Sequence, residues 1–165
     1  MKTLVQRLEE GQSDQQAVDN LRNSYFKFIT RINARVRALL KCPYVYFITF
    51  TIAPEYEDVP YHKVVRKIKE TLRLSLSFIF NEDYGSKNGR LHFHGIVATH
   101  DILDYTKYLE IYQYGAINIK PITVFNEKAL KEYVLKQQLH MTKGTAQRIY
   151  KSKKMPPAYE CYILT

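Results

Sequence analysis

The stretch that decides the fold is LSFIFNEDY-GSKNG-RLHFHGIVAT, which covers residues 76–99. Two runs rich in β-branched and aromatic residues flank a short segment with two glycines, a pattern typical of a β-hairpin. Successive side chains of a strand point to opposite faces, so His92 and His94 share one face while Phe93 lies on the other. Two imidazoles about 7 Å apart on one face can bind the same divalent metal, and the apolar face can pack against a core.

The pairing of the two hairpin strands predicts which carboxylate lies beside the histidines. A turn centred on Lys87 places Glu82 directly across from His92. Phe80 then pairs with His94. Because cross-strand partners share a face, this pairing makes Glu82 the third metal ligand.

Hydrophobic periodicity and turn residues predict the other elements. In order, we expect a helix over 13–41, a strand over 44–52, a basic helix over 62–74, hairpin strands over 76–84 and 90–99, a helix over 101–114, a strand over 116–122 and a helix over 126–139. A basic, polar extension follows over 142–165, with an extended segment near its end. Strand, helix, strand, strand, helix, strand is the split β-α-β order of ferredoxin-like folds. We therefore expect an α+β domain with a four- to five-stranded antiparallel sheet, helices on one face and an extra N-terminal helix.

Composition bounds the class of protein. A chain of 165 residues suits a single domain spanning 1–165. Its 25 Lys and Arg against 16 Asp and Glu give a net charge of +9, which favours a polyanionic partner such as nucleic acid. Cys42 and Cys161 are too few for a disulfide scaffold. With no apolar leader and no run of 18 apolar residues, we expect an intracellular protein that does not engage a membrane.

The predicted last helix carries a candidate nucleophile. Tyr133 and Lys136 are three residues apart and so lie on the same side of a helix. A phenol is almost fully protonated at neutral pH, and a nearby ammonium group or metal favours its phenolate. Tyr133 is therefore a usable nucleophile toward phosphorus.

Together these segments resemble the His-hydrophobe-His (HUH) endonucleases, the rolling-circle replication initiators of plasmids, phages and single-stranded DNA viruses. The sequence FITFT at 47–51 is similar to the first motif of that family, RLHFHG at 90–95 to the second and YVLK at 133–136 to the third. The three segments follow the family's order on the expected strand, strand and helix.

The resemblance implies a nickase for single-stranded DNA. His92 and His94, with one acidic residue, would hold Mg²⁺ or Mn²⁺, and Tyr133 would attack the scissile phosphate and remain joined to its 5′ side. Lys136 would steady the phenolate or the charge of the transition state. The spacing of 83–85, Asp-Tyr-Gly, is similar to the Glu-Tyr-Gly of phage initiators, and it makes Asp83 the alternative to Glu82 as third ligand.

The resemblance also implies partners. The substrate would be single-stranded DNA at a replication origin, in a stem-loop, in a prokaryotic cytoplasm or a virus-infected cell. A separate host helicase would be a further partner, and the protein would act as a monomer or homodimer. The residues expected to bind DNA are Thr49, Thr51, Arg90, Lys131, Lys143 and Arg148.

Two other functions remain open from the sequence. A single-tyrosine transposase of a small insertion sequence is similar in size, and Gln137 matches its glutamine four residues after the tyrosine. A non-catalytic single-strand or RNA-binding module is the other, with Tyr44, Tyr46 and Phe50 as a stacking platform for bases.

Overall fold

The computed structural model describes residues 14–85, 89–122 and 149–151, and it divides the chain into two compact units, Met1–Ala34 and Arg35–Thr165. Helix α2 (Asp14–Leu40) provides the described residues of the first unit and ends in the second. Pro43 follows its end and cannot continue a helix, since proline has no N–H to donate. The predicted N-terminal helix is confirmed.

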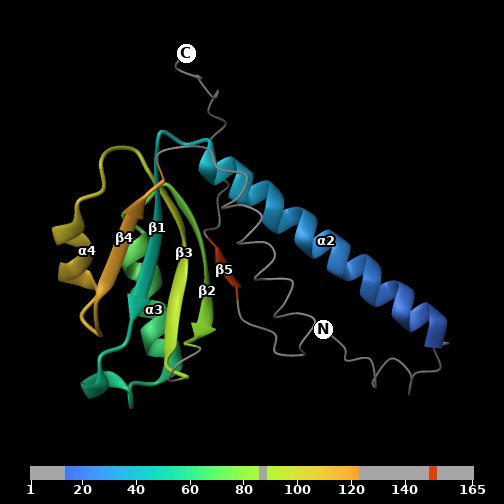
Figure 1. The fold of residues 1–165 in the computed structure, drawn as a ribbon, viewed down its shortest axis with the longest axis horizontal. Coiled ribbons are helices and arrows are strands. Elements are labelled where there is room, and N and C mark those ends of the chain that lie inside the picture. Colours follow the sequence, from blue (N-terminus) through green and yellow to red (C-terminus); the bar gives the residue numbers. More distant parts are fainter. Residues whose placement is uncertain (1–13, 86–88, 123–148, 152–165) are drawn as a thin grey trace. The chain divides into compact units, whose positions relative to one another are not determined.

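The second unit is built on a five-stranded antiparallel sheet (Figure 1). Its strands are β1 (Tyr44–Thr51), β2 (Ser77–Tyr84), β3 (Leu91–Thr99), β4 (Ile117–Pro121) and β5 (Ile149–Lys151), in the order β4-β1-β3-β2-β5. Strands β1 and β2 are both antiparallel to β3, which lies between them. They are therefore parallel to each other and joined through a helix, which is the split β-α-β arrangement. The predicted α+β class is confirmed.

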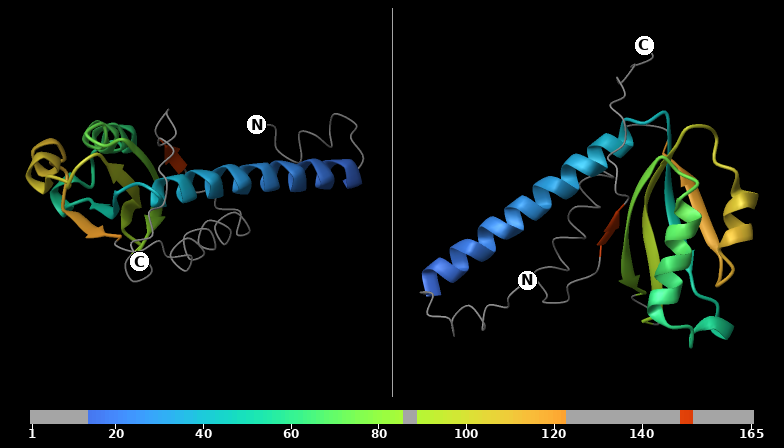
Figure 2. Two further views of the ribbon diagram at one scale, coloured as in Figure 1. Left: turned by 90° about the horizontal axis from the view of Figure 1, so that it is seen from above. Right: turned by 180° about the vertical axis from the view of Figure 1, so that it is seen from behind.

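Two helices cover one face of this sheet, as the left view of Figure 2 shows. They are α3 (Tyr61–Leu72) and α4 (Tyr105–Ile111). Apolar residues of α3 at helical spacing pack on the apolar face of the strands. The core they form contains Ile48, Phe50, Val64, Val65, Ile68, Leu72, Phe78, Phe80, Phe93, Val97, Tyr108, Tyr112 and Ile117. The opposite face of the sheet, called the open face below, carries polar side chains around His92 and His94 and buried apolar ones, such as Val45 and Ile96, further along the strands.

Helix α4 is shorter than the predicted span of 101–114. Its start is fixed by Asp104, whose side chain accepts hydrogen bonds from the backbone N–H groups of Thr106 and Lys107. Tyr112 ends it with an extended backbone and packs its ring against Phe50 in the core. A local cap and one buried ring therefore override the longer hydrophobic pattern.

Strand β5 was not predicted, because its three residues lie in a segment whose overall composition is basic and polar. Ile149 and Lys151 pair with Asn81 and Ile79 at the edge of β2. The predicted helix over 126–139 and the extended segment over 159–164 lie outside the described residues. Within residues 14–85, 89–122 and 149–151, no helix has the length and apolar character needed to cross a bilayer.

Candidate metal centre

The register of the hairpin decides which side chains meet on the open face. Asp83 pairs with His92, and Asn81 pairs with His94. Glu82 instead pairs with Phe93 and so shares the face that the helices cover, where 9% of its surface is exposed. The prediction of Glu82 as third ligand is therefore wrong, and Asp83, its alternative, lies with the histidines.

The error comes from the turn. The Gly85 N–H donates to the Arg90 carbonyl oxygen at 2.9 Å, so these two residues face each other and the pairing shifts by one residue from a turn centred on Lys87. Gly89 has φ +65°, a left-handed conformation that favours glycine. Since side chains alternate with a period of two, a shift of one residue moves every side chain of β2 to the other face.

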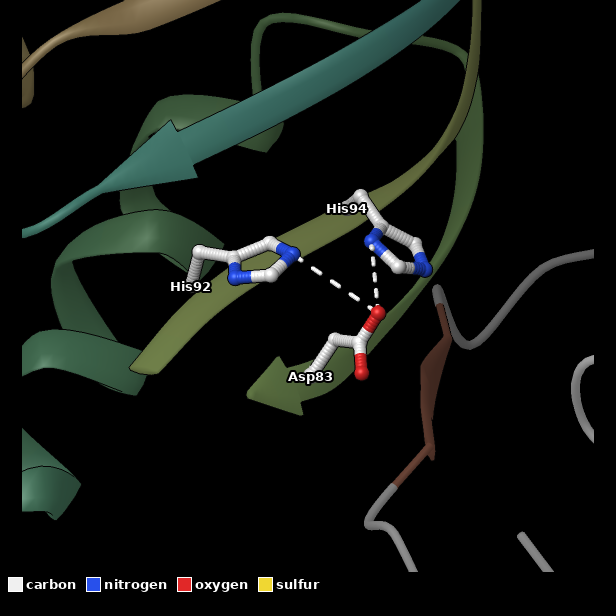
Figure 3. Close-up of side chains that lie close together, drawn as sticks. All are labelled: Asp83, His92 and His94. Atoms are coloured by element: carbon white, nitrogen blue, oxygen red, sulfur yellow. Dashed lines mark ion pairs between the residues drawn. The ribbon is translucent and has the colours of Figure 1, made fainter. Parts of the chain in front are cut away.

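Asp83, His92 and His94 form a compact group that could hold a metal ion (Figure 3). Asp83 Oδ2 lies 3.7 Å from His92 Nε2 and 3.8 Å from His94 Nδ1. One ligand atom of each residue lies within 4.8 Å of the others. Ligand atoms about 2.1 Å from one ion are at most about 4.2 Å apart, so the side chains would have to rotate to bring all three atoms closer together around one ion.

Neighbouring groups hold these side chains in orientation. Asp83 Oδ1 accepts a hydrogen bond from the Tyr84 backbone N–H at 2.9 Å, which leaves Oδ2 directed at the imidazoles. His92 Nδ1 lies 3.4 Å from the Arg90 carbonyl oxygen, and a proton on Nδ1 leaves the lone pair of Nε2 facing Asp83. A backbone carbonyl that fixes the tautomer of a histidine is the usual outer partner of a metal ligand.

The second imidazole is packed from the side. The rings of Phe47 and His94 are stacked with centroids 5.8 Å apart, and 5% of His94 is exposed. His92 is more open to solvent, with 25% of its side chain exposed. The group is thus packed against a ring at His94 and open to solvent at His92.

The two threonines of the first motif lie next to these histidines. Thr49 pairs with His94 and Thr51 pairs with His92, so all four residues share the open face. The Thr51 hydroxyl donates to the Ala116 carbonyl and accepts from the Ala116 N–H, both at 3.2 Å. Thr51 therefore fastens the start of β4 to β1, a structural contact that the sequence did not predict.

Two polar residues of β4 complete the open face. Asn118 pairs with Thr49, and Lys120 pairs with Phe47; both side chains are exposed. Sequence analysis did not single them out, although the alternation of residues 117–120 predicts that they share one face. Arg90, predicted to bind DNA, forms an ion pair with Glu57 at 3.2 Å.

Of the predicted stacking platform of Tyr44, Tyr46 and Phe50, the structure buries Phe50 and leaves Tyr44 exposed. Their alternation places all three on the face that the helices cover, with Phe50 fully buried. The Tyr46 hydroxyl accepts from the Leu103 N–H at 3.0 Å. Phe47, one residue out of phase, is the aromatic residue of β1 on the open face.

The predicted nucleophile Tyr133 and its partner Lys136 lie outside the described residues. The same holds for three predicted DNA-binding residues, Lys131, Lys143 and Arg148. No family model matches the chain, and neither a curated protein nor a solved structure is similar to it. Fold and site together define an α+β protein with an antiparallel sheet and a His-X-His and aspartate group that could hold a metal ion.

Proposed function

We propose that this protein is a metal-dependent endonuclease that nicks and rejoins single-stranded DNA through a 5′-phosphotyrosine and so initiates rolling-circle replication. The observation that carries the proposal is the group of Asp83, His92 and His94 beside the open face of a split β-α-β sheet. The net charge of +9 supports a polyanionic substrate.

Asp83, His92 and His94 fit a divalent cation in number, donor type and spacing. A bound Mn²⁺ or Mg²⁺ supplies Lewis acidity to an oxygen of the scissile phosphate. Two imidazoles among three protein ligands favour Mn²⁺ over Mg²⁺, because Mg²⁺ prefers an all-oxygen shell. His92 is partly exposed, so a phosphate would approach the metal group from the side of His92.

Tyr133 supplies the nucleophile in this proposal. Its phenolate oxygen forms a bond to phosphorus while the bond from phosphorus to the 3′ oxygen breaks, and the leaving oxygen takes up a proton to become a free 3′ hydroxyl. Lys136 offsets the charge that develops on the phosphoryl oxygens. One phosphodiester replaces another, so a 3′ hydroxyl can attack the phosphotyrosine and restore the DNA strand.

A covalent adduct tests the proposal. The full-length protein is incubated with labelled single-stranded oligonucleotides of varied sequence and Mn²⁺, and adducts are resolved on a denaturing gel. We expect an adduct that is lost in Tyr133→Phe and in His92→Ala/His94→Ala. His100→Ala is the matched control, because His100 follows the same strand but is exposed and outside the group.

Two results would count against the proposal. If the unmutated protein forms no adduct with any of the sequences, the proposed nuclease activity is excluded. An adduct that persists in Tyr133→Phe excludes Tyr133 as the nucleophile and assigns the covalent step to another residue.

A further inference from the structure

A pocket of about 430 Å³ opens at the end of the sheet where β3 begins. Its lining combines apolar and polar groups. The apolar part comes from Ile52, Val59, Tyr61, Val64 and Leu91, and Glu57, Gly89 and Arg90 complete it. This volume lies within the range of about 300–1,000 Å³ that is typical of small-ligand sites. The pocket therefore has room for one flat heteroaromatic group.

The rim of this pocket carries one acid and one base. Glu57 Oε1 and Arg90 Nη2 are 3.2 Å apart, and each side chain is 55% exposed. An ion pair so open to water is weak, so either group can exchange its partner for a ligand at small cost. The pocket thus offers a carboxylate acceptor and a guanidinium donor side by side above apolar walls.

The loop that supplies Glu57 is fixed to the sheet. The Ala53 N–H donates to the Tyr114 carbonyl at 2.9 Å, and the rings of Tyr56 and Tyr114 lie 5.5 Å apart. The Val59 N–H donates to the Tyr56 carbonyl at 3.0 Å. The acidic side of the rim is therefore held before any ligand arrives, which lowers the entropic cost of binding.

The pocket lies at the same end of β3 as the metal group but on the face of the sheet that the helices cover, since Leu91 and His92 point to opposite faces. Leu91 of the pocket wall directly precedes His92, and Ile52 follows Thr51, the cross-strand partner of His92. The carbonyl of Arg90 lies 3.4 Å from His92 Nδ1. A nucleotide strand whose phosphate sits at the histidines reaches this pocket with a neighbouring base by passing over the end of the sheet at Arg90 and Leu91.

We propose that the pocket binds a guanine base of the single-stranded substrate. The Watson–Crick edge of guanine presents two N–H donors next to a carbonyl acceptor, which matches the Glu57 carboxylate and the Arg90 guanidinium. Tyr61, whose ring lies 5.9 Å from that of Phe93, provides an aromatic wall for the base. The inference rests on the proposed function for its substrate class and assigns a sequence preference next to the nick.

Nucleotide binding to the full-length protein tests this site without metal or cleavage. Amide NMR spectra are recorded in EDTA during titration with dGMP, dAMP, dCMP or dTMP. We expect dGMP to shift the amides of Val59 and Leu91 and to bind on the order of tenfold more tightly than the other three. Glu57→Gln removes the preference for dGMP, whereas Asp58→Asn, the same charge change one residue away and outside the pocket lining, retains it.

Equal binding of the four nucleotides, shifts confined to other residues, or an unchanged preference in Glu57→Gln would overturn the guanine site. An unchanged remainder of the spectrum shows that each variant is folded. This titration needs neither metal nor Tyr133. Selective dGMP binding without a covalent adduct would therefore exclude the proposed nuclease activity and support the guanine site. A covalent adduct without selective dGMP binding would support the nuclease activity and exclude the guanine site.

Discussion

At the scale of single residues, two neighbouring carboxylates have different surroundings. Asp83 lies beside both histidines on the open face, whereas Glu82 lies on the face that the helices cover. We expect Asp83→Asn to weaken Mn²⁺ binding by at least about tenfold, because an amide is a poorer ligand than a carboxylate. Isothermal titration calorimetry of the metal-free protein measures this effect.

Glu82→Gln is the matched control for that measurement, since it removes the same charge from the adjacent residue. Its Mn²⁺ affinity should stay within about twofold of the unmutated value, because the side chain is directed away from the group. A larger loss in Glu82→Gln than in Asp83→Asn would contradict the observed register.

The same two residues show how far sequence can predict the site. The period of two along a strand is enough to put His92 and His94 on one face. The choice between Glu82 and Asp83 depends on a shift of one residue, and Gly85 and Arg90 set that shift through backbone pairing at the turn. Such a shift leaves no trace in hydrophobicity, because β2 is buried on both faces up to Asp83.

At the scale of elements, the hairpin depends on glycines used for different reasons. A Cβ on Gly95 would overlap the Ile79 carbonyl oxygen and come within 2.6 Å of the Phe80 Cα, while a Cβ on Gly89 meets nothing within 4 Å. We expect Gly95→Ala to lower the free energy of unfolding by about 3 kcal/mol, through overlap with backbone that cannot move aside. Urea denaturation followed by circular dichroism measures the loss.

Gly89→Ala is the comparison, because its cost comes only from the left-handed φ of +65°. That cost is about 1–2 kcal/mol. If Gly95→Ala proved the milder of the two changes, the close approach of β2 and β3 at this point would be wrong.

Two buried tyrosines, Tyr108 within helix α4 and Tyr112 at its end, provide a second test of packing. The Tyr112 hydroxyl donates to the Thr51 carbonyl at 2.8 Å, whereas the Tyr108 hydroxyl has no hydrogen-bond partner within the described part of the chain. Burial raises the pKa of Tyr108 to about 12, so its phenol is neutral in any ordinary buffer. We expect Tyr112→Phe to lower the free energy of unfolding by about 1 kcal/mol and Tyr108→Phe to leave it unchanged or raise it.

The pair of variants removes the same atom from the same residue type, so each is the control of the other in urea denaturation. Equal losses would show that the Tyr108 hydroxyl has a partner after all. The sequence predicted a helix here, but it does not reveal which tyrosine hydroxyl lies beside the Thr51 carbonyl. The long apolar pattern of α3 was enough to predict that helix from the sequence. Strand β5 has three residues, which are too few to show a hydrophobic pattern.

At the scale of the whole molecule, the net charge of +9 and the position of the metal group lead us to expect that single-stranded DNA binds along the open face. Composition predicts a polyanionic partner without saying where it binds. The proposed reaction supplies a position, since a DNA strand that reaches Asp83, His92 and His94 must cross the strands beside them. Lys120, exposed and paired with Phe47 on the open face, would then contact a phosphate.

Salt dependence tests that path. Affinity for a single-stranded oligonucleotide in EDTA should fall with salt, with a slope of log K against log salt of about −2 to −4, as expected for about three to six phosphate contacts. Lys120→Ala should reduce the slope by about 0.7, the contribution of one contact. Lys63→Ala, which removes an exposed lysine of α3 on the other side of the sheet, should leave it unchanged. Fluorescence anisotropy between 50 and 200 mM salt distinguishes the two, and an equal effect of both variants would mean that the strand does not follow the open face.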